Sequence, residues 1–461
     1  MLHRSRIAAW KQPNTSRLHN AAPGTLLAAG EQRNRMKWSQ YGRITLALIA
    51  TLSLGLSVTA CNPSFTLGYV FALGAGGSQG QISGYTIDSV SGALTPAVGS
   101  PFPAAGQFPV ADAVDNRSKW LYVVNEASNS IVQFAIGSGA TLQKLNTYTT
   151  PGTFPIAVTI DNESRYLFVV DSFAPAFNAQ VSAGLNNGSV VGPKLNPISY
   201  PSATFPTYGC VAVYPISYTD GSLGAPVADP VSGQSCFPLN GQQAQQGSQP
   251  VGATATAFVN YLYVADQGTH SVYGYSVNYT TGVLTDIANN NYQSGVKPSA
   301  VTSDPTGRFV YVTDAYSNQL LGFNVQNDGS LQAMLNGPFA TSLYPDGIVI
   351  DPRGYYLYVA NFNANTVQSY AIDAGTGNPT LLKANPSVVT STGPTCLSIE
   401  SAYGRFLYVS DLQDNTVSGF ELDPHTGQLT AVLNTPFAAV QNPTCLGTAA
   451  NGSHPIQSIT P

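Results

Sequence analysis

The stretch Gly404–Thr430, GRFLYVSDLQDNTVSGFELDPHTGQLT, contains the unit that repeats along the chain. Phe406–Val409 is a short aromatic and β-branched run, which is typical of a buried strand. After a polar break, Val417–Leu422 alternates as a further strand, and a turn rich in Asp, Pro, Thr and Gly leads to a weaker one at Gln428. Pro394–Ile399 supplies a preceding strand of small residues. We therefore expect one unit to be four antiparallel strands.

The unit recurs at a nearly constant spacing. A proline opens the small-residue strand in each of seven copies, at Pro109, Pro155, Pro250, Pro298, Pro345, Pro394 and Pro443. Successive prolines are 46 to 49 residues apart, except for one interval of 95 residues. A period of about 48 residues with four short strands per repeat is the signature of a β-propeller. The sequence predicts an all-β fold, a seven-bladed β-propeller of four-stranded antiparallel blades.

The two ends of the repeat array predict how the ring closes. The N-terminal copy lacks its proline strand and begins directly at Phe65–Leu73, whereas Asn442–Gly452 is a spare proline strand at the C-terminus. We expect this last strand to complete the first blade. Closure of the ring removes exposed sheet edges, which would otherwise promote aggregation.

Charge is distributed unevenly along the chain. Residues 1–60 contain eight of the 18 Lys and Arg residues but only one of the 23 acidic residues. The remainder has ten basic and 22 acidic residues, a net charge of −12. Such a surface repels phosphate backbones, so nucleic acid is not an expected partner.

The N-terminal region resembles the export signal of a bacterial lipoprotein. A basic segment after Met36 is followed by the apolar run Ile44–Val58, which is too short to span a membrane as a helix. The next residues complete LSVTAC, which is similar to a lipobox and ends at Cys61. The resemblance implies that Cys61 is acylated and becomes the mature N-terminus. An ordinary signal peptide is the alternative.

These segments predict the domain organisation and the location. We expect an unpatterned extension over 1–35, a signal peptide over 36–60 and the propeller over 61–461, with Met36 as an alternative start. The protein is expected outside the cytoplasm and attached to the bacterial membrane by a lipid. Because Asn62 rather than Asp follows the cysteine, the outer membrane or the cell surface is favoured.

The third blade carries two insertions, over about 172–209 and 224–249. In an antiparallel meander both connections lie on the face that also carries the loops after the second strands, which we name the upper face. Long loops on a rigid scaffold are where binding usually occurs. We therefore expect a small-molecule or protein ligand there, and a monomeric protein. The lower face carries six of the ten basic residues of 61–461 in tight turns, which we interpret as structural.

Four cysteines follow Cys61. Cys210 and Cys236 both lie at the upper end of the inserted blade, so an oxidising compartment favours a disulfide between them. Cys396 and Cys445 each stand two residues after a strand-opening proline, where the other five blades have Ala or Gly. Equivalent residues of adjacent blades point the same way around the ring. We therefore expect Cys396 and Cys445 to be buried free thiols.

Candidate functional residues are those that depart from the repeat. Six of the second strands end in Asn or Asp, which either form a ligand ring or, as we favour, cap their own turns. Asp112 and Asp346 lie near the expected axis, while Glu126 and His270 lie in upper loops. Each is either a catalytic candidate or an ordinary solvated residue. No motif for a cofactor is present, although carboxylates and carbonyls near the axis leave calcium as an alternative.

The repeats LYVVN, LYVAD, VYVTD, LYVAN and LYVSD are similar to those of YVTN-type propellers. Together with the turn TGxLT they resemble the lactonase family related to 6-phosphogluconolactonase and carboxymuconate cycloisomerase, over about residues 65–450. The resemblance implies lactone hydrolysis by Arg, His and Glu side chains around the axis. The proline strands here contain no Arg and no His, so whether the protein is an enzyme stays open. We expect a binding or scaffold module, with a hydrolase of small sugar acid lactones as the alternative.

Overall fold

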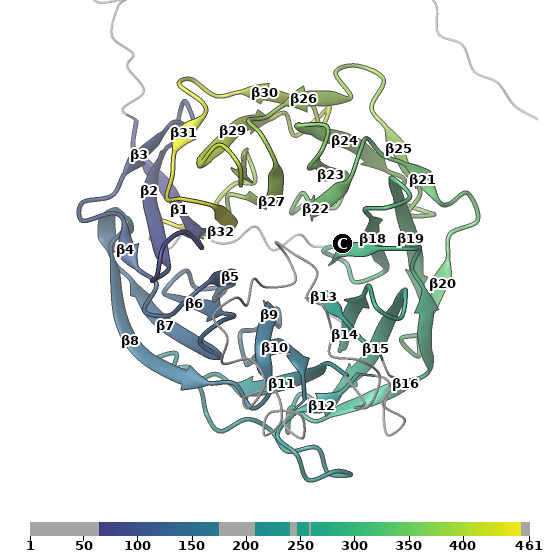
Figure 1. Cartoon of the computed structure of the whole chain (residues 1–461). Coiled ribbons are helices and arrows are strands. Elements are labelled where there is room, and N and C mark those ends of the chain that lie inside the picture. The colour runs from purple at the N-terminus through teal and green to yellow at the C-terminus, as the bar shows by residue number, and fades with distance from the viewer. Residues whose placement is uncertain (1–63, 175–207, 240–246, 258–259, 453–461) are drawn as a thin grey trace, which may run out of the picture. The chain divides into compact units, whose positions relative to one another are not determined.

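The computed structural model describes residues 64–174, 208–239, 247–257 and 260–452. The chain divides into two units, Met1–Asn62 and Pro63–Pro461, and the first lies outside the described residues together with Cys61. In the described part of the second unit, seven antiparallel sheets surround a common axis (Figure 1). The predicted seven-bladed propeller is confirmed.

The first three blades differ from one another at their outer edges. Their strands are β1 (Thr66–Gly74), β2 (Gln81–Asp88), β3 (Leu94–Pro96) and β4 (Phe102–Pro103) in blade 1; β5 (Pro109–Val114), β6 (Trp120–Asn125), β7 (Ser130–Ile136) and β8 (Leu142–Thr149) in blade 2; and β9 (Thr153–Ile160), β10 (Tyr166–Phe173), β11 (Cys210–Pro215) and β12 (Phe237–Pro238) in blade 3. The outer strand β12 of blade 3 has two residues, as has β4 of blade 1. The first predicted insertion separates β10 from β11, although Ser172 and Phe173, which were expected in it, belong to β10.

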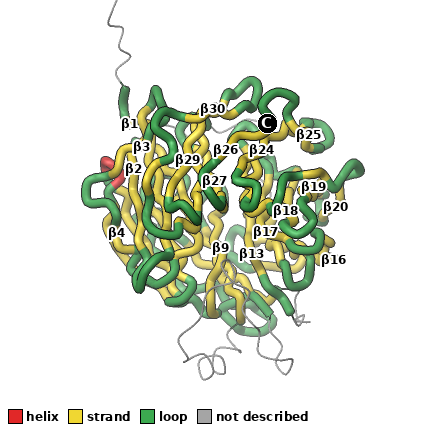
Figure 2. Tube along the Cα trace, turned by 45° about the horizontal axis from the view of Figure 1, so that its top comes forward, coloured by secondary structure: helices red, strands yellow, loops and turns green. Residues whose placement is uncertain are grey.

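Blades 4 to 7 follow the repeat closely. Their strands are β13 (Pro250–Ala255), β14 (Tyr261–Asp266), β15 (Ser271–Val277) and β16 (Leu284–Gln293); β17 (Pro298–Ser303), β18 (Phe309–Asp314), β19 (Gln319–Val325), β20 (Leu331–Ala333) and β21 (Phe339–Ala340); β22 (Pro345–Ile350), β23 (Tyr356–Asn361), β24 (Thr366–Ile372), β25 (Pro379–Leu381) and β26 (Ser387–Val389); and β27 (Pro394–Ile399), β28 (Phe406–Asp411), β29 (Thr416–Leu422), β30 (Leu429–Ala431) and β31 (Phe437–Ala438). The helix in the described residues is the single turn η1 (Ser138–Ala140), drawn red in Figure 2. No helix of the described part is long and apolar enough to cross a membrane.

The C-terminal strand closes the ring as predicted. β32 (Pro443–Ala450) pairs antiparallel with β1, and Phe71 lies opposite Gly447. β32 is thus the innermost strand of blade 1, in the position that the proline strand occupies in the other blades.

The tyrosine of the YV step connects adjacent blades. In five blades its hydroxyl donates to the carbonyl of the turn glycine in the next blade, as in Tyr311 to Gly377 (2.6 Å) and Tyr358 to Gly427 (3.0 Å). The other three pairs are Tyr122 with Gly221, Tyr263 with Gly329 and Tyr408 with Gly92. The repeated tyrosine and the turn glycine of the next blade are therefore two halves of one contact. Buried phenols require such a partner.

Turns of the lower face are rigid for a similar reason. Asp351 is fully buried and accepts hydrogen bonds from the backbone of Tyr355 (2.7 Å) and Tyr356 (2.8 Å). Arg353 pairs with this carboxylate at 2.7 Å and also donates to the Gly404 carbonyl of the next blade at 3.1 Å. These contacts support the structural interpretation of this face.

Two disulfides stabilise the described propeller. The predicted Cys210–Cys236 bond is present, with Cα atoms 5.7 Å apart. Cys396 and Cys445 are also bonded, with Cα atoms 4.9 Å apart, so the prediction of free thiols is wrong. The register of β27 shifts between Pro394 and Cys396, and β32 has a similar shift. Such a bulge re-aims the following side chain, and it places the two sulfurs within bonding distance on neighbouring inner strands.

Candidate functional site

The upper face is built from connections that bond to one another. In four blades an Asn in the turn after the second strand adopts a left-handed conformation, and its Oδ1 accepts the backbone N–H of the residue before the next strand-opening proline. Asn318, for example, has a φ of 55° and accepts from Tyr344 N at 2.7 Å. Asn tolerates this conformation better than most residues. Each blade thereby fixes the entry to the inner strand of the next blade.

The residues before the strand-opening prolines form a ring at the upper end of the axis. They are Phe108, Phe154, Gln249, Lys297, Tyr344, Gly393 and Asn442. The three aromatic members have φ values between 54° and 60°, a conformation that costs bulky side chains about 1–3 kcal/mol. Strain of this kind is often found at binding sites. We name these seven residues the upper ring.

Lys297 is the cation of the upper ring. Its Nζ donates to the Tyr344 hydroxyl at 2.8 Å and lies 5.0 Å from the centre of that aromatic ring. The Tyr344 ring in turn packs against Phe362 at 5.9 Å. Among the described residues, Lys297 belongs to none of the four ion pairs. A half-buried ammonium held by a phenol is a natural partner for an anion.

Lys297 is not among the residues predicted from the sequence, because it lies one position before its proline strand. A signal was nevertheless present. Aligned on their prolines, the seven copies have Phe, Phe, Gln, Lys, Tyr, Gly and Asn at this position, so a single copy carries a charge.

His270 stands at the junction that leads to Lys297. It takes the place of the tying Asn in blade 4, with a φ of 58° and an exposed side chain. Its carbonyl accepts from Ser294 N at 2.9 Å, while Lys297 N bonds to Asp314 Oδ1 at 2.9 Å. The Asn tie is therefore absent before Lys297, as it is before Phe108 and Gln249.

The other sequence candidates lie in two different blades. Asp112 is half-buried on β5, where its carboxylate packs so closely on Gly447 of β32 that a Cβ there would collide with it. Glu126 is buried at the upper turn of the same blade, and its backbone N–H donates to the Phe108 carbonyl at 2.8 Å. Asp346 is half-buried on β22, two residues after Tyr344. Asp346 is thus the carboxylate closest in sequence to the Lys297–Tyr344 pair.

The strand-ending Asn and Asp residues are completely buried and belong to the scaffold. Asp314 accepts backbone N–H groups from its own turn at Tyr316 and from the preceding connection at Val296 and Lys297. Burial raises the pKa of the Asp314 carboxyl, but these hydrogen bonds outweigh it and the net pKa is lowered. Burial dominates elsewhere and raises the pKa of Asp171 and of Asp411 to about 7. Asp314 thus joins its own turn to the connection before its blade, which extends the predicted turn-capping role.

One compact group of possible metal ligands occurs in the described residues. The ligand atoms of Asp171, Cys210 and Cys236 lie within 4.8 Å of one another, but both sulfurs are committed to the disulfide. Asp112 and Asp346 do not join any such group in the described part. The calcium alternative, which also includes backbone carbonyls, stays a prediction.

Comparison with known proteins agrees with this architecture. Residues 109–174 and 285–399 match the profile of the family described as "Lactonase, 7-bladed beta-propeller". The periplasmic gluconolactonase of Pseudomonas aeruginosa is similar in structure, with a TM-score of 0.62 at 20% identity, over 84% of this chain and 99% of that one. The chain is a seven-bladed β-propeller, and two of its segments are similar to the lactonase family.

Further solved structures have the same fold. A candidate 6-phosphogluconolactonase of Bacteroides fragilis is similar with a TM-score of 0.61 at 19% identity, over 83% of this chain and 98% of that one. A protein of Lactobacillus plantarum gives a TM-score of 0.59 at 21% identity, over 83% and 99% of the two chains. No curated protein matches the sequence. At these identities the similarity concerns the propeller fold.

Proposed function

We propose that this lactonase-type propeller is an extracytoplasmic binding module that takes a small organic anion at its upper ring. The observation that carries the proposal is Lys297, a half-buried cation without an ion pair among the described residues, fixed by Tyr344 at 2.8 Å. A positioned cation beside aromatic rings selects an anion with an apolar or sugar-like body.

Sugar acids are the expected ligand class. The half-buried Phe108 and Tyr344 of the upper ring offer aromatic faces for the C–H groups of a sugar. Gln249 adds a carboxamide, whose oxygen accepts from Gln267 Nε2 at 3.3 Å. Carboxamides bind hydroxyl groups as donors and acceptors. The two disulfides support a location in an oxidising compartment. An acylated Cys61 would attach the module to the membrane, and mass spectrometry of the mature N-terminus tests this part of the proposal.

Calorimetric titration of the mature protein with gluconate tests the binding site. Lys297→Gln is the informative variant, because Gln249 occupies the same ring position in blade 4 and the side chain is therefore sterically acceptable. We expect at least a tenfold loss of affinity, about 1.4 kcal/mol. Lys144→Gln, at an exposed position on β8, removes an equal charge and should bind like the wild type. Equal binding by all three proteins would refute the role of Lys297.

Lactone hydrolysis is the second candidate, favoured by the likeness to the gluconolactonase and by Asp346 next to the upper ring. A hydrolase needs a base or water-positioning group beside the cation. Because the proline strands contain no Arg or Lys for a phosphate, we expect no appreciable turnover of 6-phosphogluconolactone. Turnover of this lactone or of gluconolactone that disappears in Asp346→Asn or Glu126→Gln would establish the enzyme instead.

A further inference from the structure

A cavity lies away from the axis, between blades 3 and 4. It has a volume of about 490 Å³ and is bounded by the segment Asp229–Pro238 on one side and by β15 and β16 on the other. A volume of this size is within the range of small-ligand sites, about 300–1,000 Å³. Its position on the outer part of the blades makes it independent of the upper ring.

The cavity exists because the fourth strand of blade 3 is irregular. Val227 N donates to Val213 O on β11 at 2.8 Å, and the chain then leaves the sheet in a turn at Asp229–Gln234 before β12 returns. Asp229 stabilises this turn, since its carboxylate accepts from Val231 N (3.0 Å) and Ser232 Oγ (2.6 Å). The turn stands over the face of β16 rather than pairing with it.

Two acidic residues line this cavity. Asp229 lies in the turn and Asp286 on β16, and the lining contains no Lys, Arg or His among the described residues. Burial raises the pKa of the Asp286 carboxyl, and the negative charge of Asp229 raises it further, which agrees with their closeness. Asp286 takes part in none of the described ion pairs. The cavity therefore has a negative charge that the surrounding protein does not neutralise.

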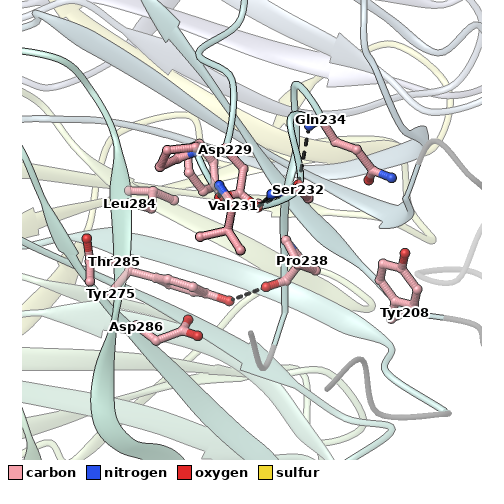
Figure 3. Close-up of a pocket in the computed structure, with 12 residues that line it drawn as sticks. Tyr208, Asp229, Val231, Ser232, Gln234, Pro238, Tyr275, Leu284, Thr285 and Asp286 are labelled. Atoms are coloured by element: carbon pink, nitrogen blue, oxygen red, sulfur yellow. Dashed lines mark hydrogen bonds between the residues drawn. The ribbon is translucent and has the colours of Figure 1, made fainter. Parts of the chain in front are cut away.

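The remaining lining combines the polar residues Ser232, Gln234 and Thr285 with aromatic and apolar side chains. Figure 3 shows Tyr275 beside Asp286, with its hydroxyl donating to the Pro238 carbonyl at 3.0 Å, and Tyr208 on the far side of Pro238. Phe237 and Leu284 complete the apolar part. Aromatic rings next to carboxylates recognise organic cations, by charge and by cation–π contact.

We propose that the cavity between blades 3 and 4 is a binding site for a small organic cation, an ammonium group attached to an apolar body, with Asp286 as the main charge partner. The ammonium lies against the Asp286 carboxylate and the apolar body against Tyr275 and Leu284. An inorganic cation would use the charge but not this apolar surface.

Titration of the mature protein with benzylammonium chloride tests the site, with benzyl alcohol as the neutral analogue. We expect benzylammonium to bind at least fivefold more tightly than benzyl alcohol, and Asp286→Asn to remove this preference. Asp328→Asn, an exposed turn carboxylate of blade 5, makes the same charge change and should keep it. Raising the salt from about 50 mM to about 500 mM should weaken binding of benzylammonium only.

Three results would overturn the proposal. They are equal affinity for the two probes, unchanged binding of benzylammonium by Asp286→Asn, and binding of calcium chloride without binding of benzylammonium. Asp286 is an exposed residue, and circular dichroism checks that Asp286→Asn leaves the fold intact. If this variant is misfolded, the salt dependence of benzylammonium binding by the wild type still tests the proposal.

Discussion

At the scale of single residues, the residues that repeat along this chain form contacts between blades. The YV tyrosine, the TG turn, the tying Asn and the strand-ending Asp are each used across a blade boundary or between two connections. Sequence periodicity predicted their positions but not their partners, because the partner lies in the next repeat. Lys297 was overlooked for a related reason, since its setting is a ring contributed by seven separate segments.

The tyrosine contact predicts a measurable stability difference. Tyr311→Phe removes the hydroxyl that donates to Gly377 O at 2.6 Å and leaves that buried carbonyl without this donor. We expect the free energy of unfolding in urea to fall by about 1–2 kcal/mol. Tyr316→Phe is the matched control, because the Tyr316 side chain is 73% exposed. An equal effect of the two substitutions would contradict the role of the contact.

The buried carboxyl of Asp411 predicts a pH dependence. Its pKa is raised to about 7 in the folded protein, against about 3.9 in the unfolded chain. Between these values the unfolded chain releases the proton first, so stability falls by about 1.4 kcal/mol per pH unit as the pH rises from about 4 to about 7. Asp411→Asn should remove the Asp411 part of this decline and leave the part that comes from Asp171, whose pKa is also raised to about 7. Asn361 already occupies the equivalent position in blade 6.

Asp314→Asn provides the comparison for Asp411→Asn. The pKa of Asp314 is lowered in the folded protein, so its contribution is present above the unfolded pKa and is lost as the pH falls through the folded value. The two variants should therefore change the pH profile of urea unfolding in opposite directions. Parallel profiles would contradict the assignment.

At the scale of elements, the strands were predictable and their local irregularities were not. Aromatic and β-branched runs placed the second strands, and prolines placed the inner strands, because both patterns depend on local propensity and burial. The bulges after the prolines depend on register with a neighbouring strand. They decide where Cys396 and Cys445 point, so reasoning from an ideal strand gave the wrong redox state.

The Cys396–Cys445 bond predicts a specific loss of stability. It closes a sequence separation of 49 residues between the inner strands of blades 7 and 1, for which the chain-entropy model gives about 4 kcal/mol. Replacing both residues with Ala should destabilise the protein by roughly this amount. Alanine fits this position sterically, because Ala111, Ala157 and Ala300 occupy it in other blades. Thiol titration of the denatured, unreduced wild type should detect neither cysteine.

At the scale of the whole molecule, ring closure is the property most securely encoded in the sequence. The N-terminal repeat lacks its inner strand and the C-terminus has one strand in excess, which predicted the pairing of β1 with β32. The ligand sites were less accessible to prediction. The upper ring collects one residue from each blade, and the cavity between blades 3 and 4 depends on the path of an irregular segment.

Truncation tests ring closure. A chain ending at Val440 lacks β32, so β1 loses the partner that covers its inner edge. We expect this variant to unfold at lower urea concentration and to form aggregates in size-exclusion chromatography, because an unpaired strand edge is a template for association. A monomeric variant of wild-type stability would show that closure is not needed.

The central claim is that Lys297 marks the ligand site of this seven-bladed propeller. A crystal structure of the mature protein with gluconate tests it most directly, since it locates the ligand. We predict that the gluconate carboxylate lies within hydrogen-bond distance of Lys297 Nζ, with the sugar chain against the upper ring. Gluconate bound elsewhere on the propeller, with the upper ring containing only solvent, would contradict the claim.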